Sequence, residues 1–114
     1  MSLLRTDLWV AAFVRRHNNL GHICVIGRKG DPVAGQILLV QDHLDRTLSL
    51  YTPAPAALRR DEDGADRVFQ RRFDHADPLK VRERITRELD FDPDVWVVEV
   101  DLRNDDLGIR VAEG

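Results

Sequence analysis

The chain has 114 residues, with 17 basic and 20 acidic side chains, a net charge of −3 and one cysteine, Cys24. A chain of this length buries one hydrophobic core, so we expect a single domain over residues 1–114. A lone cysteine excludes a disulfide framework and a four-thiolate metal site, and it is typical of the reducing cytoplasm.

The longest apolar run, Leu8 to Val14, is much shorter than the roughly 20 residues that cross a bilayer, so the sequence predicts no membrane partner. The net charge argues against a generic nucleic-acid binder, but the charge is unevenly distributed. Residues 1–60 carry eight basic and four acidic side chains, a net +4, and residues 61–114 carry a net −7.

The first predicted element is a helix from about Asp7 to Asn18, with Thr6 as its N-cap. Its residues from Leu8 to Val14 are apolar on all sides, so we expect neighbouring structure to cover most of its circumference. In so small a domain a second copy of the chain is one way to supply that cover. Trp9 and Phe13, one helical turn apart, are the predicted anchors of this interface.

Four β-rich runs follow the helix. They are His22–Arg28, Gln36–Asp42, Leu48–Thr52 and Arg67–Asp74. Turn-forming Gly, Asp and Pro separate the first two, and a shorter turn separates the next two, so the pattern predicts hairpins and an antiparallel meander.

A second helix begins after Asp77, with Pro78 at its first position and one apolar stripe of Val81, Ile85 and Leu89. The following run, Val95–Leu102, is apolar on both faces over its first half, which is typical of an interior strand. The predicted fold class is therefore α+β, in the order αββββαβ, with a mainly antiparallel sheet packed with two helices.

Four segments occur together in an order that is similar to one known family: Leu8–Arg16, Arg28–Asp31 with Ala34-Gly35, Leu50–Pro55 and Phe91–Glu99. They resemble DUF1491, an uncharacterised bacterial family, and Phe-Asp-Pro-Asp-Val-Trp-Val-Val-Glu is the most specific block. The likeness extends from about Leu4 to Arg103, which places the core at about 4–103 and a C-terminal tail at about 104–114. It implies a small, stand-alone bacterial protein and no particular substrate, cofactor or catalytic residue.

Two groups of residues have the type and spacing of metal ligands. Asp90, Asp92 and Asp94 alternate as carboxylates do in calcium loops, but Val95 stands where an EF-hand needs glycine, and turn formation explains the three acids without an ion. His22 and Cys24 share one face of a strand and lack two further zinc ligands, so packing explains Cys24. The sequence therefore predicts no metal and no cofactor. It leaves open whether Asp42, Asp90, Asp92 and Asp94 form a cation site and whether Cys24 has a role beyond packing.

The clearest nucleic-acid signal is the alternation of Arg67, Phe69, Arg71 and Phe73 on one predicted strand face, with Arg59 and Arg60 upstream. Aromatic rings stack on unpaired bases and arginines neutralise phosphates. The competing interpretation places both phenylalanines in the core, with the arginine stems along the edge of the sheet.

The order of elements also resembles the core of restriction-type nucleases, which hold Mg²⁺ with carboxylates and position water with a lysine. Asp42 follows the second strand, but the third strand, Leu48–Thr52, has neither an acid nor a lysine. We therefore favour a non-enzymatic protein-interaction or regulatory module of the cytoplasm, acting as a homo-oligomer or with another protein. Nucleic-acid binding is the first alternative and a metal-dependent nuclease-like hydrolase the second; the sequence identifies no catalytic residue.

Overall fold

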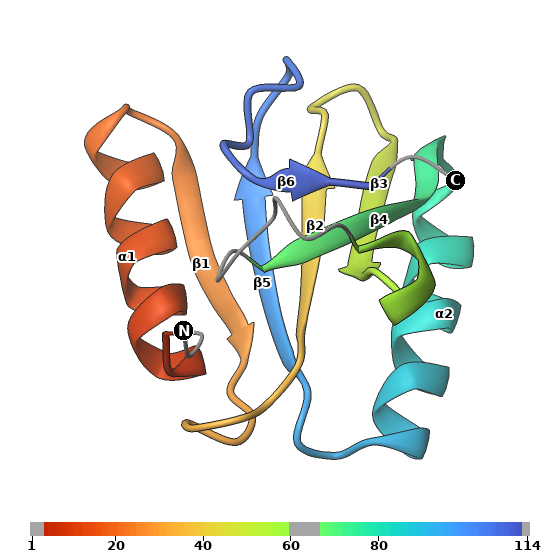
Figure 1. Cartoon of the computed structure of the whole chain (residues 1–114). Coiled ribbons are helices and arrows are strands. Elements are labelled where there is room, and N and C mark those ends of the chain that lie inside the picture. The colour runs from red at the N-terminus through yellow and green to blue at the C-terminus, as the bar shows by residue number, and fades with distance from the viewer. Residues whose placement is uncertain (1–3, 60–66, 113–114) are drawn as a thin grey trace.

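A computed structural model describes residues 4–59 and 67–112 of the chain. Two α-helices, a short 3-10 helix and six strands follow one another as α1 (Thr6–Asn19), β1 (Ile23–Arg28), β2 (Ile37–Asp42), β3 (Leu48–Pro53), η1 (Ala56–Leu58), β4 (Val68–Ala76), α2 (Pro78–Phe91), β5 (Trp96–Asp101) and β6 (Arg110–Val111) (Figure 1). The α+β class and the order αββββαβ are confirmed, with β6 as an additional strand. Neither α1 nor α2 combines the length and the apolar character that a membrane span needs.

The six strands form one sheet in the order β1-β5-β2-β3-β4-β6. β1 pairs antiparallel with β5, and β2–β3 and β3–β4 are antiparallel neighbours, but β2 runs parallel to β5 and β4 runs parallel to β6. The sheet is therefore mixed, and the prediction of a mainly antiparallel meander is wrong. The predicted hairpin between the first two strands does not form, because β5 lies between β1 and β2.

The connection from β1 to β2 passes around the start of β5 instead of closing a hairpin. Arg28 Nη1 donates hydrogen bonds to the carbonyls of Pro93 and Val95, at 2.8 Å each. A Cβ at Gly30 would overlap the carbonyl of Asp94, so only glycine fits there. The glycines that suggested a tight turn in the sequence are thus needed for close approach to the incoming strand.

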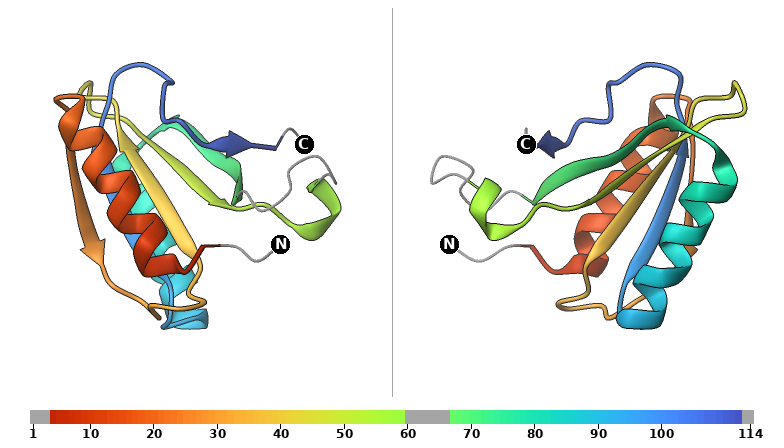
Figure 2. Two further views of the ribbon diagram at one scale, coloured as in Figure 1. Left: turned by 60° about the vertical axis from the view of Figure 1, so that its left-hand side comes forward. Right: turned by 90° about the vertical axis from the view of Figure 1, so that its right-hand side faces the viewer.

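The two helices lie on opposite faces of the sheet, and the β3–β4 hairpin curls toward the side of α1 (Figure 2). The core on the α1 side includes Phe13, Tyr51, Phe69 and Trp96. The core on the α2 side is built around Val81 and Ile85 with aliphatic residues of β2, β3 and β5. β5 is buried on both faces over its first three residues, as its sequence predicts.

α2 forms as predicted. The carboxylate of Asp77 accepts a hydrogen bond from the amide of Leu79 at 2.9 Å, Pro78 occupies the first turn, and Val81 and Ile85 are buried. The negative capping side chain also complements the positive end of the helix dipole.

α1 differs from its prediction in two ways. Arg5 is its N-cap residue without a side-chain cap, and Thr6 is the first helical residue. Only Thr6, Val10, Phe13 and His17 are buried, while Leu8 is 52% exposed. The apolar helix therefore lies on the surface with one buried stripe, and the described residues do not cover most of its circumference as the sequence led us to expect.

The segment after β5 belongs to the packed structure beyond the expected core boundary near residue 103. Leu107 is 2% exposed in the core on the α1 side, and β6 pairs with β4. Both Arg16 Nη2, at 3.0 Å, and His17 Nε2, at 2.9 Å, hydrogen bond to the carbonyl of Leu107. These contacts anchor the C-terminal segment to the end of α1.

Candidate functional site

The Arg–Phe alternation of β4 does not produce one continuous surface. Tyr51 pairs with Arg71 while the neighbouring Leu50 pairs with Phe73, so Arg72 is an extra residue in a β-bulge. The bulge reverses the side-chain alternation, and Phe69 packs in the core on the α1 side whereas Phe73 packs against the core on the α2 side. The expected shared face of Arg67, Phe69, Arg71 and Phe73 is therefore wrong.

Arg71 is occupied by contacts within the chain. Its Nε donates to the hydroxyl of Tyr51 at 3.2 Å, its guanidinium lies 5.4 Å from the centre of the Tyr51 ring, and its Nη1 lies 3.8 Å from a carboxylate oxygen of Asp74. Tyr51 in turn donates to Gln41 Oε1 at 3.2 Å. These contacts tie Arg71 to a polar network at the end of the sheet where β2 and β5 terminate.

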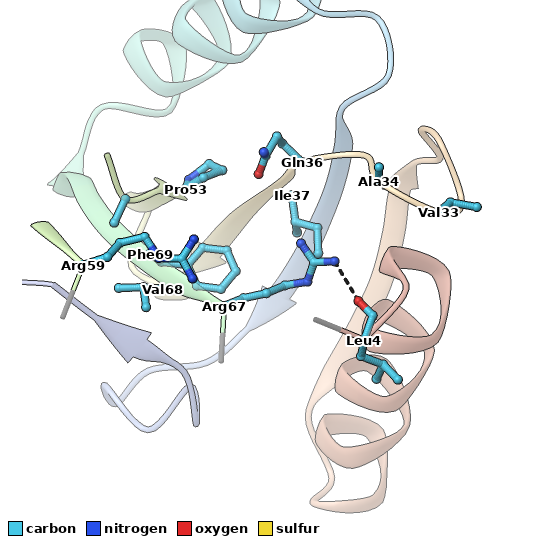
Figure 3. Close-up of a pocket in the computed structure, with 11 residues that line it drawn as sticks. Leu4, Val33, Ala34, Gln36, Ile37, Pro53, Arg59, Arg67, Val68 and Phe69 are labelled. Carbon is cyan, nitrogen blue, oxygen red and sulfur yellow. Dashed lines mark hydrogen bonds between the residues drawn. The ribbon is translucent and has the colours of Figure 1, made fainter. Parts of the chain in front are cut away.

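Arg67 and Phe69 meet at a pocket near the opposite end, where β2 and β4 begin. The pocket has a volume of about 270 Å³. Its lining residues come from the N-terminal segment, the β1–β2 connection and strands β2, β3 and β4: Leu4, Val33, Ala34, Gln36, Ile37, Pro53, Ala54, Arg59, Arg67, Val68 and Phe69. Figure 3 shows the Arg59 side chain reaching toward Phe69 and the guanidinium of Arg67 directed toward the carbonyl of Leu4.

Arg67 is held in place by neutral oxygens. Its Nη2 donates to the Leu4 carbonyl and to the Thr6 hydroxyl, at 3.0 Å each, and its buried Nε has no hydrogen-bond partner among the described residues. The pKa of Arg67 is lowered mainly by burial and to a smaller extent by the positive charge of Arg59. Among the described residues that line the pocket, none has an acidic side chain. Two arginine side chains, Arg59 and Arg67, are part of this lining.

Thr6 is a residue whose role the sequence did not reveal. Its side chain is completely buried, and its hydroxyl donates to the Gly35 carbonyl at 2.8 Å while accepting from Arg67. In the sequence it has the position and chemistry of a helix cap. In the structure it connects α1, the β1–β2 connection and the arginine of the pocket.

A second polar cluster, at the other end of the sheet, contains a serine–histidine pair. Ser49 Oγ lies 2.7 Å from His43 Nε2, and the rings of His43 and His75 stack at 3.6 Å. A catalytic triad would need a carboxylate at His43 Nδ1, and this buried atom has no partner in the part of the chain that the structure describes. Ser49 is also fully buried and accepts the amide of His75 at 3.0 Å. The pair is thus built into the sheet and is not presented as a nucleophile.

Two of the carboxylates proposed above as metal ligands accept hydrogen bonds from backbone amides in turns. Asp92 Oδ1 accepts the amide of Asp94 at 3.0 Å, and Asp42 Oδ1 accepts the amide of Leu44 at 2.9 Å. Asp42 lies opposite Asp101 in the parallel pair of β2 and β5. Within residues 4–59 and 67–112, no three acids, histidines or cysteines gather as metal ligands do.

Cys24 is 3% exposed in the core on the α1 side, and burial raises the pKa of its thiol to about 11. A protonated, buried thiol is a poor nucleophile and a poor metal ligand. The neighbouring His22 pairs with His17, Nδ1 to Nδ1, at 2.9 Å.

The predicted interface anchors on α1 face inward. Phe13 is 3% exposed, and Trp9 is partly buried and stacks on it with ring centres 5.2 Å apart. The outer edge of β1 is also covered at one point: the side-chain amide of Asn18 donates to the carbonyl of Cys24 and accepts its N–H, at 3.0 Å each. A neighbouring strand would make the same two bonds, so Asn18 protects an edge that would otherwise invite pairing.

Fold and pocket together define a small α+β protein with a mixed sheet between two helices and an arginine-lined cavity near one end. The sequence matches DUF1491, described as a protein of unknown function, over residues 4–108, and the chain belongs to this family. A search of curated proteins found no match.

Solved structures support this assignment. A crystal structure of a DUF1491 family protein from Caulobacter crescentus is 29% identical, covers 97% of this chain and 99% of its own, and has a TM-score of 0.77. The solution structure of a protein from A. tumefaciens is 30% identical, with coverage of 100% and 98% and a TM-score of 0.82. An NMR structure of a DUF1491 family protein from Caulobacter crescentus is 30% identical, with coverage of 99% and 100% and a TM-score of 0.78.

Proposed function

We propose that this protein is a non-enzymatic binding module that holds a small anion in the pocket of Arg59 and Arg67. The observation that carries the proposal is a cavity of about 270 Å³ lined by the cation Arg67, whose Nη2 is held by two uncharged oxygens, with no acidic side chain among the described lining residues. Burial lowers the pKa of Arg67, and repulsion by the positive charge of Arg59 lowers it further. An anion placed beside Arg67 offsets that repulsion. It would also accept charge-assisted hydrogen bonds in a partly dry site.

The size of the pocket favours a small ligand. Ligand pockets are typically roughly 300–1,000 Å³, and this one lies just below that range. Nucleic-acid binding through an aromatic platform is less favoured, because Phe69 is 2% exposed and Phe73 is partly buried against the other core. Regulation by a bound anion agrees with the interpretation of the chain as a regulatory module.

The proposal is tested by thermal unfolding with inorganic phosphate or butyrate against chloride at equal ionic strength. Phosphate stabilises most proteins by exclusion from their surface, so a matched variant is needed. Arg67→Gln removes one guanidinium of the pocket, and Arg72→Gln removes the same charge from β4, at an exposed residue outside the pocket.

A ligand at 100 times its dissociation constant adds about 2.7 kcal/mol of stability. We expect an anion-specific increase in Tm for the wild type and for Arg72→Gln that Arg67→Gln loses. Equal increases in all three proteins would contradict the proposal. Titration of a fluorescent oligonucleotide with the protein in the same buffers tests the alternative function, nucleic-acid binding. Only a nucleic-acid binder raises the fluorescence anisotropy of the oligonucleotide to a level that falls steeply with salt.

Self-association and a cytoplasmic location stay predictions from the sequence. The large apolar side chain that α1 exposes is Leu8, rather than the predicted anchors Trp9 and Phe13. Light scattering over a concentration series decides whether the chain is a homo-oligomer.

A further inference from the structure

We propose that the part of the sheet face left open beside α2 is a docking surface for a cationic amphipathic helix of another protein. This surface, the β1–β5 face, consists of Ile23 and Val25 of β1 and Glu99 and Asp101 of β5. None of these residues lines the pocket of Arg67, so a partner bound here leaves the anion site open.

Strand pairing places the side chains of the β1–β5 face on one side of the sheet. Ile23 is opposite Asp101, and Val25 is opposite Glu99, in the antiparallel pair of β1 and β5. Side chains that lie opposite each other in such a pair share a face and are close neighbours. That face is the one on which α2 lies, because Arg82 of α2 hydrogen bonds to Glu99.

α2 covers other strands and leaves this face open. The core beneath α2 takes its side chains from β2, β3 and the start of β5, and it includes no described residue of β1. Figure 1 shows α2 beside β3, with β1 at the opposite edge of the sheet. Ile23 is 65% exposed and Val25 is 52% exposed. Two large β-branched side chains therefore face solvent next to a helix that is already packed.

The uncovered face has the width of one helix. Neighbouring strands are about 4.8 Å apart, so β1 and β5 together span roughly the 10 Å diameter of a helix. Sheets of this class are covered by helices, and a helix over β1 and β5 would complete the layer that α2 begins. Addition of a strand is less suited, because the side-chain amide of Asn18 already occupies both backbone groups of Cys24 at the edge.

Asp101 gives the face the charge that selects its partner. Burial raises the pKa of Asp101, and repulsion by Asp42 and then by Glu99 raises it further. Among the described residues, no cation forms an ion pair with the Asp101 carboxylate. A cation supplied by a partner would offset this repulsion, whereas the same acids repel nucleic acids and anionic membrane surfaces.

Glu99 shows how a helix complements an acid on this face. Arg82 extends from α2, and its Nη2 donates to Glu99 Oε1 at 2.7 Å. A lysine or arginine on a helix lying over β1 would do the same for Asp101, while the apolar stripe of that helix covers Ile23 and Val25. The partner is therefore an amphipathic helix whose apolar stripe is flanked by basic residues.

The test titrates a fluorescent amphipathic peptide of about 18 leucine and lysine residues with the full chain and follows its anisotropy. The same peptide with glutamate in place of lysine tests the charge. Asp101→Asn removes the acid, and Asp90→Asn makes the same change at an exposed residue of α2 outside the face. Val25→Ser removes apolar surface, and Val111→Ser makes the same change at a valine of β6 that is 41% exposed.

We expect saturable binding of the lysine peptide and none of the glutamate peptide. Asp101→Asn weakens the affinity about fivefold, as expected for loss of a partly exposed ion pair. Val25→Ser weakens it about fourfold, the effect of about one buried methylene group. Asp90→Asn and Val111→Ser retain the wild-type affinity. Thermal unfolding shows whether each variant is folded, and Ile23→Ser replaces Val25→Ser if that variant is not.

No binding, equal affinity for the two peptides, or effects of Asp101→Asn and Val25→Ser no larger than those of their controls would overturn the proposal. Light scattering tests a second copy of the chain as the occupant. Self-association of the wild type that Val25→Ser removes and Val111→Ser retains would replace the helical partner by that second copy.

Discussion

Replacing Thr6 by valine tests the link between the first helix and the pocket. The two side chains are nearly the same shape, so the substitution removes a hydroxyl and adds little volume. That hydroxyl is completely buried, donates to the Gly35 carbonyl at 2.8 Å and accepts from Arg67 at 3.0 Å. Leaving buried polar groups without a partner costs about 1–3 kcal/mol. We therefore expect Thr6→Val to lower the free energy of unfolding by about 2 kcal/mol.

The assay is equilibrium unfolding in urea. With a slope of about 2 kcal/mol per molar, the expected loss moves the midpoint by about 1 M. Thr6→Ser is the matched control, because it keeps the hydroxyl and loses one methyl group, which costs about 0.8 kcal/mol. A valine variant as stable as the wild type, or more stable than the serine variant, would refute the structural role of this hydroxyl. The affinity for inorganic phosphate gives a second readout: Thr6→Val weakens it because Arg67 loses one of its two supports, whereas Thr6→Ser retains it.

Three further predictions concern the core and its ionisable groups. Phe69→Ala is expected to destabilise the fold by about 3–5 kcal/mol in urea unfolding, because Phe69 is 2% exposed. Phe91 is 91% exposed, so Phe91→Ala is expected to change the stability little. Equal effects of the two substitutions would contradict the assignment of Phe69 to the core. Burial lowers the pKa of both His17 and His43, so folding favours their neutral forms. The contribution of these neutral histidines to the free energy of unfolding is complete above the ordinary pKa of about 6.5. It is lost as the pH falls toward the lowered pKa values, by at most about 1.4 kcal/mol per pH unit for each group. Urea midpoints at pH 7 and pH 5 check this decrease, which double substitution of the two histidines by glutamine removes; an unchanged decrease would contradict it. The Cys24 thiol, with a pKa of about 11, is expected to react with a disulfide reagent at pH 8 only after unfolding in urea, and rapid reaction of the native protein would show that the thiol is accessible.

Local sequence patterns predicted the elements of the fold well where one segment determines its own structure. Asp77 caps α2 and Val81 and Ile85 form its buried stripe, because capping and helical periodicity act over a few residues. The two-sided apolar character of β5 likewise predicted an interior strand.

Long-range pairing was not predictable in the same way. The insertion of β5 between β1 and β2 joins segments about 60 to 80 residues apart, and the local turn residues at Gly30 and Gly35 were equally compatible with a hairpin. Close approach to the carbonyl of Asp94 explains both glycines, and at Gly35 a Cβ would also meet the carbonyl of Asp31 in the same connection. A strand pattern therefore defined each element but not its neighbours.

The candidate site was predicted only in part. Arg67 and Phe69 were selected from the sequence and do line the pocket, but the bulge at Arg72 removes Phe73 from their face. A single inserted residue in a ladder leaves no clear mark in the sequence, because it depends on the partner strand. The contribution of Thr6 was missed for a similar reason, since a buried threonine that supports an arginine has the same sequence pattern as a helix cap.

The most direct test of the anion site is a titration of the ¹⁵N-labelled protein with inorganic phosphate, followed by two-dimensional NMR. Binding at the pocket predicts saturable shifts of the amides of Thr6, Gln36, Arg67 and Val68, which Arg67→Gln abolishes and Arg72→Gln retains. Saturable shifts confined to residues outside the pocket, or no saturable shifts at all, would contradict the account.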